Sequence, residues 1–319
     1  MQNRWRRTIS SPGNEEYRFS GGYFGIHFMH IDTHQHFWFY NPSEYAWIDD
    51  SMAVLRRDFL PADLKPELER AGFPGTVLVQ VRQTLEETRW MLDLAAEHPF
   101  VAGVVGWVDL RSENLREQLE IFATNPKFVG VRHIVQSEPD EEFLLRPEFL
   151  RGVSLLSAFG LAYDLLIYHR HLPVSIEFAR KVPQLRIALN HLAKPAIRDH
   201  ILHPWAENIR ELAKCPNVYC KLSGHVSEAD WHKWKPEDIT PYLDVALESF
   251  GPDRLMIGSD WPVSTLAASY ARSMDVVKNY LEKSPGEVRE KVLGGNALRF
   301  YRLPIAASES SAKHASRKE

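Results

Sequence analysis

Four side chains in this sequence are of the types that hydrolytic enzymes and metal centres use. His34 and His36 stand one residue apart in HIDTHQHFWFY (30–40), at the end of an apolar run. Asp260 closes a second apolar run, DRLMIGSD, and His191 closes a third, LRIALNH. Side chains two apart on a strand point the same way, so His34 and His36 face one side. Two imidazoles and a carboxylate can hold a divalent metal with an open water position.

Each of these residues has more than one chemical use. An isolated His-x-His pair more often caps a strand or bonds backbone groups than binds a metal. Asp260 changes that balance, because it can supply the third ligand or act as the general base that takes a proton from an attacking water. His191 can complete the coordination or hydrogen-bond a reacting carbonyl. These alternatives stay open at the level of the sequence.

The elements that position these side chains are short β-rich runs separated by helical stretches. Helical spacing of apolar residues occurs in LEETRWMLDLAAEH (85–98), SENLREQLEIFAT (112–124) and LPVSIEFARKV (172–182). Several of the runs are continuously apolar, which is typical of parallel strands buried on both faces. The predicted strands span 30–36, 76–81, 101–107, 128–133, 161–168, 185–191, 217–223 and 253–260.

Strand–helix alternation of this kind predicts an α/β fold with a parallel sheet. Eight such units predict a distorted (β/α)8 barrel, whose usual size is about 250 residues. A doubly wound open sheet would carry a Gly-rich turn after its first strand. The sequence has HQHFWF there instead. In a barrel the active site lies at the C-terminal ends of the strands, where the four residues above fall.

Further polar and aromatic residues follow the same strand ends. Lys194, Lys221 and Arg132 are predicted to bind substrate hydroxyls or the developing negative charge of an acid product. Arg132 could equally form an ion pair with Asp109 or Asp164, and Lys194 could be solvated. Most aromatic residues after the first strand are expected to pack its loop onto the barrel. The other predicted substrate contacts are Gln80, Trp107 and Trp38.

Composition excludes several other classes of protein. Lys and Arg total 38 against 42 Asp and Glu, a net charge of −4 without a polybasic stripe, which argues against nucleic-acid binding. The sequence has no run of 18 or more apolar residues, the length that a membrane-spanning helix needs. The basic stretch MQNRWRRTIS is not followed by the apolar h-region of a secretory signal peptide. Cys215 and Cys220 fit no metal or redox spacing. We expect buried free thiols and a cytoplasmic location.

Composition also divides the chain. Residues 1–28 are polar and Gly-rich without periodicity, so we expect a loosely ordered leader. Residues 304–319 are small and polar and are expected to be a disordered tail. The barrel is predicted to occupy residues 29–303.

Longer motifs show a resemblance to a known family. The chain resembles the amidohydrolase superfamily and its amidohydrolase 2 branch, most of all the sugar-lactone hydrolases of the L-fucono-lactonase and L-rhamnono-lactonase type. His-x-His and GSDWP carry the superfamily likeness, and NHLAKP, CKLSG and LRRDFLPADL are more specific to the lactonase group. The matching stretches run from about residue 31 to residue 303.

The resemblance implies hydrolysis of a lactone ring by a distorted barrel. The family's metal positions fall on His34, His36 and Asp260, and its strand-six histidine falls on His191. It implies one divalent metal, zinc being expected, although some relatives in the branch work without it. Strand four ends in VRH without a lysine, so a binuclear centre is not expected.

Two positions depart from the branch, and two other activities remain open. Asn190 replaces the usual Asp before the strand-six histidine, and strand alternation predicts that it points away from the barrel centre. Ser264 stands where Cys is common. A hydrolase of an aromatic-derived lactone such as a pyrone dicarboxylate would need several Arg residues. A decarboxylase would place a metal-binding histidine at strand five, where the chain has His169 and His171 in a loop-like stretch. The expected partner is a small-molecule lactone, and the sequence leaves a homo-oligomer open.

Overall fold

The computed structural model describes residues 29–303, and the predicted leader and tail fall outside these residues. One eight-stranded parallel sheet runs in the order β1 to β8, and every strand pairs with the next along the chain. This arrangement confirms the predicted (β/α)8 barrel. The strands are β1 (Ile31–Gln35), β2 (Gly75–Val79), β3 (Val101–Gly106), β4 (Phe128–His133), β5 (Ala162–Leu165), β6 (Ile187–Leu189), β7 (Val218–Leu222) and β8 (Leu255–Ile257).

Seven strands lie within the apolar runs found in the sequence, and β2 begins one residue before its run, at Gly75. Almost every strand residue is buried, as expected for parallel strands covered on both faces. The last strand returns to the first through a few contacts at its end. Asp260 N donates to His34 O (2.8 Å) and His36 N donates to Trp261 O (2.8 Å). The barrel is therefore closed at the point where the candidate residues leave the sheet.

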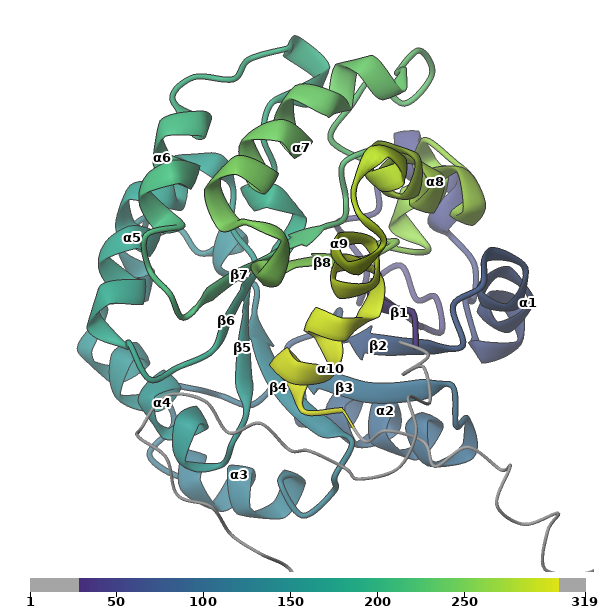
Figure 1. Cartoon of the computed structure of the whole chain (residues 1–319). Coiled ribbons are helices and arrows are strands. Elements are labelled where there is room, and N and C mark those ends of the chain that lie inside the picture. Colours follow the sequence, from purple (N-terminus) through teal and green to yellow (C-terminus); the bar gives the residue numbers. More distant parts are fainter. Residues whose placement is uncertain (1–28, 304–319) are drawn as a thin grey trace, which may run out of the picture.

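Helices surround the strands, as Figure 1 shows. Three of them, α2, α3 and α5, lie within the stretches where helical spacing was found. The helices are α1 (Pro61–Ala71), α2 (Leu85–Glu97), α3 (Leu115–Phe122), α4 (Pro147–Ala158), α5 (Leu172–Lys181), α6 (Trp205–Leu212), α7 (Pro236–Phe250), α8 (Tyr270–Tyr280), α9 (Gly286–Glu290) and α10 (Asn296–Tyr301).

Helix α10 covers the end of the barrel at which the strands begin (Figure 1). Phe300 and Tyr301 belong to a buried apolar cluster with inward residues of the strands. Arg186, just before β6, donates to Phe300 O and to Gly160 O, which ties the helix to the starts of β5 and β6. This end is therefore closed, and only the opposite end is left for a site.

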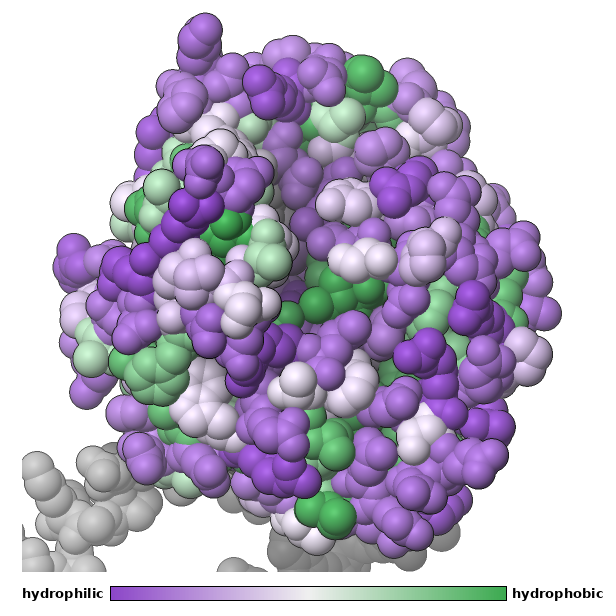
Figure 2. Space-filling model, turned by 180° about the vertical axis from the view of Figure 1, so that it is seen from behind, coloured by the Kyte–Doolittle hydropathy of each residue, from purple (hydrophilic) through white to green (hydrophobic). Residues whose placement is uncertain are grey.

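The opposite face is hydrophilic over most of its area and is hollowed near its centre (Figure 2). The strands end toward this face, and the loops that follow them line it. His36, His191 and Asp260 keep a small exposed fraction of 4–5% here. The position agrees with the rule that barrel sites lie at the C-terminal ends of the strands.

Two expectations from composition can be compared with residues 29–303. Cys215 and Cys220 are both buried and free, as predicted. None of the described helices has the length and apolarity required to cross a bilayer.

Glu87 fastens the loop after β2 to the first turn of α2. Its Oε2 accepts hydrogen bonds from Val81 N (3.1 Å) and Arg82 N (2.7 Å), and the residue is 1% exposed. Burial raises the pKa of Glu87 from 4.5 to about 7, although these two backbone hydrogen bonds act in the opposite direction.

This pKa predicts a pH dependence of stability. Between pH 4.5 and about 7 the folded state keeps a proton that the unfolded state has released, so stability falls as the pH rises. Glu87→Gln keeps an oxygen acceptor and does not titrate. As the pH rises from 4.5 to 8, we expect the free energy of unfolding of the variant to increase relative to that of the wild type by up to about 3 kcal/mol, measured by urea unfolding. Glu86→Gln, on the exposed face of α2, is the control, and parallel profiles for Glu87→Gln and the wild type would refute the assignment.

Candidate active site

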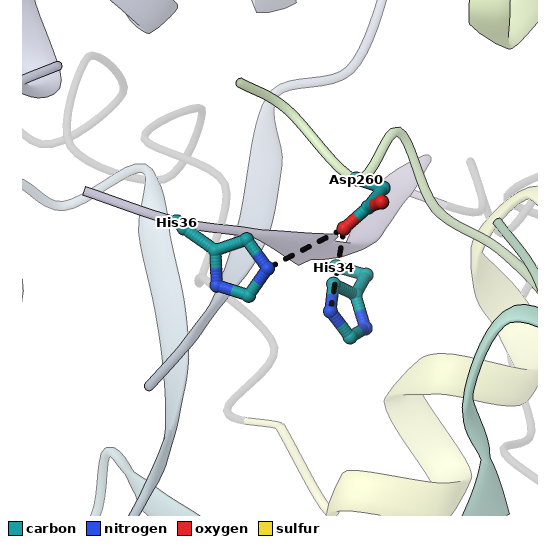
Figure 3. Close-up of side chains that lie close together, drawn as sticks. All are labelled: His34, His36 and Asp260. Carbon is teal, nitrogen blue, oxygen red and sulfur yellow. Dashed lines mark ion pairs between the residues drawn. The ribbon is translucent and has the colours of Figure 1, made fainter. Parts of the chain in front are cut away.

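Three imidazoles converge on one carboxylate oxygen at the open end of the barrel. The Nε2 atoms of His34, His36 and His191 lie 3.8, 3.4 and 3.7 Å from Oδ1 of Asp260. Figure 3 shows the His34 and His36 rings, both from the β1 segment, turned toward Asp260 on the loop after β8. The structure thus brings together all four residues whose types and positions first suggested a site.

The donor set of His36 and Asp260 fits a metal ion. His36 Nδ1 lies 2.7 Å from Val79 O, which can only accept, so this nitrogen carries the proton. Its Nε2 then presents a lone pair to Asp260 Oδ1, and two acceptors facing each other favour a cation between them. Ligand atoms of His34, His36 and Asp260 all lie within 4.8 Å of one another. These three residues are the ones for which a metal role was predicted.

His34 is held between two cations. Lys221 Nζ lies 3.3 Å from its Nδ1, and Arg132 Nη1 lies 3.2 Å from its Nε2. Burial first, and then the charges of Lys221 and other neighbours, lower the pKa of His34 well below 6.5. The ring therefore cannot carry a positive charge at neutral pH, and any metal at this nitrogen competes with the Arg132 guanidinium.

Lys221 supports the site from beneath and does not line it. Its ammonium is fully buried, donates to Thr33 O (2.8 Å) and Asp164 Oδ2 (2.5 Å), and lies beside His34 Nδ1. The other oxygen of Asp164 accepts from the Tyr301 hydroxyl (2.7 Å). The barrel interior encloses Lys221 completely, so the substrate contact predicted for it does not fit this geometry.

Asn190 also differs from its prediction. Its Nδ2 donates to Asp164 Oδ2 (3.0 Å), so the side chain points into the barrel and not away from it. The strand ends at Leu189, and His191 then turns inward through a left-handed backbone with φ of 53°. Strand alternation cannot be extended through such a residue, which is why the expectation failed.

Arg132 and Gln80 bind each other. The Gln80 amide donates to Arg132 O (3.1 Å), and Arg132 Nη2 donates to Gln80 O and lies 3.3 Å from its Oε1. Both side chains are buried, and Asp109, one suggested partner of Arg132, lies beside Arg111 (3.7 Å) instead. Gln80 therefore orients Arg132, and the guanidinium of Arg132 faces His34.

The two predicted tryptophans lie in different surroundings. Trp38 is fully buried, donates to Arg57 O (2.9 Å) and packs against Tyr45 and Phe59. It therefore packs the first loop, and the site role predicted for it does not fit. Trp107 is partly exposed, with its indole nitrogen 3.4 Å from His133 Nδ1, so a substrate contact there remains a prediction.

The protonation states suit hydrolysis by a carboxylate base. Burial lowers the pKa of His191 to about 3, against the opposing pull of Asp260. Burial alone would raise the pKa of Asp260, but charge from His191, His36 and Lys194 lowers it below 3.8. At neutral pH the arrangement is an ionised carboxylate among neutral imidazoles.

The backbone at both His191 and Asp260 is left-handed. Four consecutive residues without glycine, His191 to Lys194, have φ between 51° and 60°, and Asp260 has φ of 57°. Left-handed residues cost about 1–2 kcal/mol each. The turn is held by Lys194 N donating to His191 O (2.7 Å) and by Trp205 Nε1 donating to Leu192 O (2.7 Å). Such strain is typical of functional sites.

Sequence reasoning missed Asp32, which joins β1 to the segment after β8. Its carboxylate accepts from Ser259 N (2.9 Å), Ser259 Oγ (2.7 Å), Tyr270 OH (3.1 Å) and His34 N (3.2 Å). These bonds fix the backbone beside both His34 and Asp260. A signal was present, because a charged residue two positions before His34 stands inside a fully buried strand.

With this geometry established, comparison with known proteins identifies the family. The amidohydrolase family model of the type-2 branch matches residues 31–303, and the chain belongs to this family. The L-fucono-1,5-lactonases of Burkholderia ambifaria and Burkholderia multivorans are 39% and 40% identical to it, with 89% and 88% of this chain and 99% and 98% of theirs aligned. A solved amidohydrolase of Burkholderia multivorans with bound zinc has a TM-score of 0.84 and 40% identity, over 86% of this chain and all of that chain (100%).

The Asp32 contacts predict a positioning effect on whatever reaction the site performs. Asp32→Asn places an amide against groups that all donate, leaving buried donors unpaired at about 1–3 kcal/mol each. We expect thermal unfolding to show this destabilisation and kcat to fall about 100-fold with little change in KM. Tyr270→Phe, which removes one of the four donors, should cost about 1 kcal/mol and leave kcat within threefold. Equal kcat in Asp32→Asn and the wild type would refute the role.

Proposed function

We propose that this protein hydrolyses the ring ester of a sugar-derived lactone, of the L-fucono-1,5-lactone type. The observation that carries the proposal is the Asp260 carboxylate at the focus of three imidazoles, in a chain 39–40% identical to L-fucono-1,5-lactonases. A lactone is an ester, so its hydrolysis needs a water nucleophile, a base and stabilisation of charge at the carbonyl oxygen.

In the proposed reaction Asp260 takes a proton from water as the water oxygen attacks the acyl carbon. The bond between that carbon and the ring oxygen then breaks, and the proton passes from Asp260 to the departing alkoxide. His191 Nδ1 lies 2.9 Å from Ser223 Oγ; when that hydroxyl donates, Nε2 carries the proton and can donate to the carbonyl oxygen. The Arg132 guanidinium adds positive charge beside His34.

A divalent ion at His34, His36 and Asp260 would lower the pKa of a bound water and polarise the carbonyl. Zinc is our proposal for its identity, because a relative of 40% identity was solved with zinc. The chain supplies a base and charge at the same place through its own residues. We therefore propose that the ion strengthens a reaction that these residues already support.

The alternatives considered from the sequence find less support. A dicarboxylate substrate would need free guanidinium groups, whereas Arg132 is already bonded to Gln80 and His34. A decarboxylase of this family would need a metal-binding histidine at strand five. His169, which follows that strand, has its Nδ1 hydrogen-bonded to the backbone oxygen of Lys194 (3.0 Å).

A screen of aldonolactones with a pH indicator tests the activity. We expect acid release from at least one six-membered sugar lactone, measured with and without chelator alongside metal analysis. No acid release from any sugar lactone would refute the proposal. Full activity with far less than one ion per chain would refute the metal role alone.

Asp260→Asn tests the base. Removing a general base typically costs 10²–10⁴-fold in rate, so we expect kcat to fall by about 10³-fold in a protein that still folds. Asp253→Asn is the matched control, because Asp253 pairs with Lys291 on the surface away from the barrel mouth. Unchanged hydrolysis by Asp260→Asn would contradict the assignment.

A further inference from the structure

A second cluster of polar side chains lies beside His191 at the barrel mouth. Tyr168 follows β5, Lys194 follows β6 and Glu228 follows β7, so three neighbouring loops contribute to it. Lys194 lies in the same left-handed turn as His191, to whose carbonyl its N–H donates (2.7 Å), and its charge lowers the pKa of Asp260. Sequence reasoning identified Lys194 but gave no sign of Glu228 or Tyr168.

The two charged groups of the Lys194–Glu228 pair lie close together without a direct hydrogen bond, and both are mostly buried. Lys194 Nζ lies 3.7 Å from Glu228 Oε1, beyond hydrogen-bond length, and the two side chains are 19% and 25% exposed. The ammonium also lies 5.4 Å from the centre of the Tyr168 ring. Both charged groups therefore keep hydrogen-bonding capacity that faces solvent at the mouth.

The backbones that carry the pair are fixed. Lys194 belongs to the left-handed turn, its N–H donates to His191 O (2.7 Å), and its carbonyl is bonded by His169. Glu228 N donates to Gly224 O (3.2 Å), and Glu228 O accepts from Arg198 N (3.0 Å). Two opposite charges carried on fixed backbones and lying 3.7 Å apart are placed for a group that both donates and accepts.

A sugar hydroxyl is such a group. We propose that Lys194 and Glu228 form a subsite that binds one ring hydroxyl of the substrate, with Lys194 donating to the hydroxyl oxygen and Glu228 accepting its proton. The inference rests on the proposed lactone hydrolysis and deepens it. Hydrogen bonds to charged groups contribute about 1.5–3 kcal/mol, so the pair should discriminate hydroxylated lactones from plain ones by about 10–100-fold.

The test compares L-fucono-1,5-lactone with δ-valerolactone, the same six-membered ring without hydroxyls. Lys194→Met and Glu228→Gln should lower kcat/KM for the sugar lactone at least tenfold more than kcat/KM for δ-valerolactone, because the loss on the plain lactone measures any effect of the removed charge on Asp260. Lys181→Met, from the exposed pair with Glu177 (3.3 Å) on α5, is the matched control and should change neither.

A binding measurement covers the case in which the plain lactone turns over too slowly. In the Asp260→Asn background, calorimetry should show Lys194→Met weakening the affinity for L-fucono-1,5-lactone about tenfold. Equal losses on both lactones, or unchanged affinity, would overturn the subsite while wild-type hydrolysis of sugar lactones upholds the proposed function. A wild type inactive on every sugar lactone would overturn the function and the subsite together.

Discussion

The hydrogen bonds of Asp32 are the constraint on which the rest of the site depends. The first and last strands of a barrel have no connecting loop between them, and here β1 and β8 touch through few backbone bonds. Asp32 adds three side-chain bonds across this junction, two from Ser259 and one from Tyr270, and accepts a fourth from His34 N on its own strand. Because His34 and Asp260 lie on opposite sides of the junction, the carboxylate of Asp32 acts together with the Asp260 N–His34 O bond (2.8 Å) to hold them in place.

The charges around the site follow a consistent order. Cationic Lys221 and Arg132 face the two ring nitrogens of His34, and burial keeps the imidazoles neutral. The carboxylate at the focus of these imidazoles, Asp260, therefore remains ionised beside groups that can donate hydrogen bonds. Backbone strain at His191 and Asp260 is the cost of directing both side chains to one point.

The sequence predicted the barrel because its eight apolar runs were distinct and regularly separated by helices. It also placed His34, His36, His191 and Asp260 together, since strand ends meet at one face. It failed where local backbone or packing departs from regularity. At Asn190 the chain leaves its strand for a left-handed turn, so this side chain points in the direction opposite to the expected one. Lys221 donates its hydrogen bonds to acceptors on other strands and is buried beneath the site. Trp38 is aromatic next to a site but packs its own loop, a distinction that only the tertiary structure makes.

The central claim is that a lactone carbonyl is held against the Asp260 oxygen among the three imidazoles. A crystal structure with the 1,5-lactam of 5-amino-5-deoxy-L-fuconic acid, which keeps the ring but resists hydrolysis, tests it most directly. The account predicts the lactam carbonyl carbon facing Asp260 Oδ1, with one water between them and the carbonyl oxygen toward His191. A lactam whose carbonyl lies out of reach of both Asp260 and His191 would contradict it.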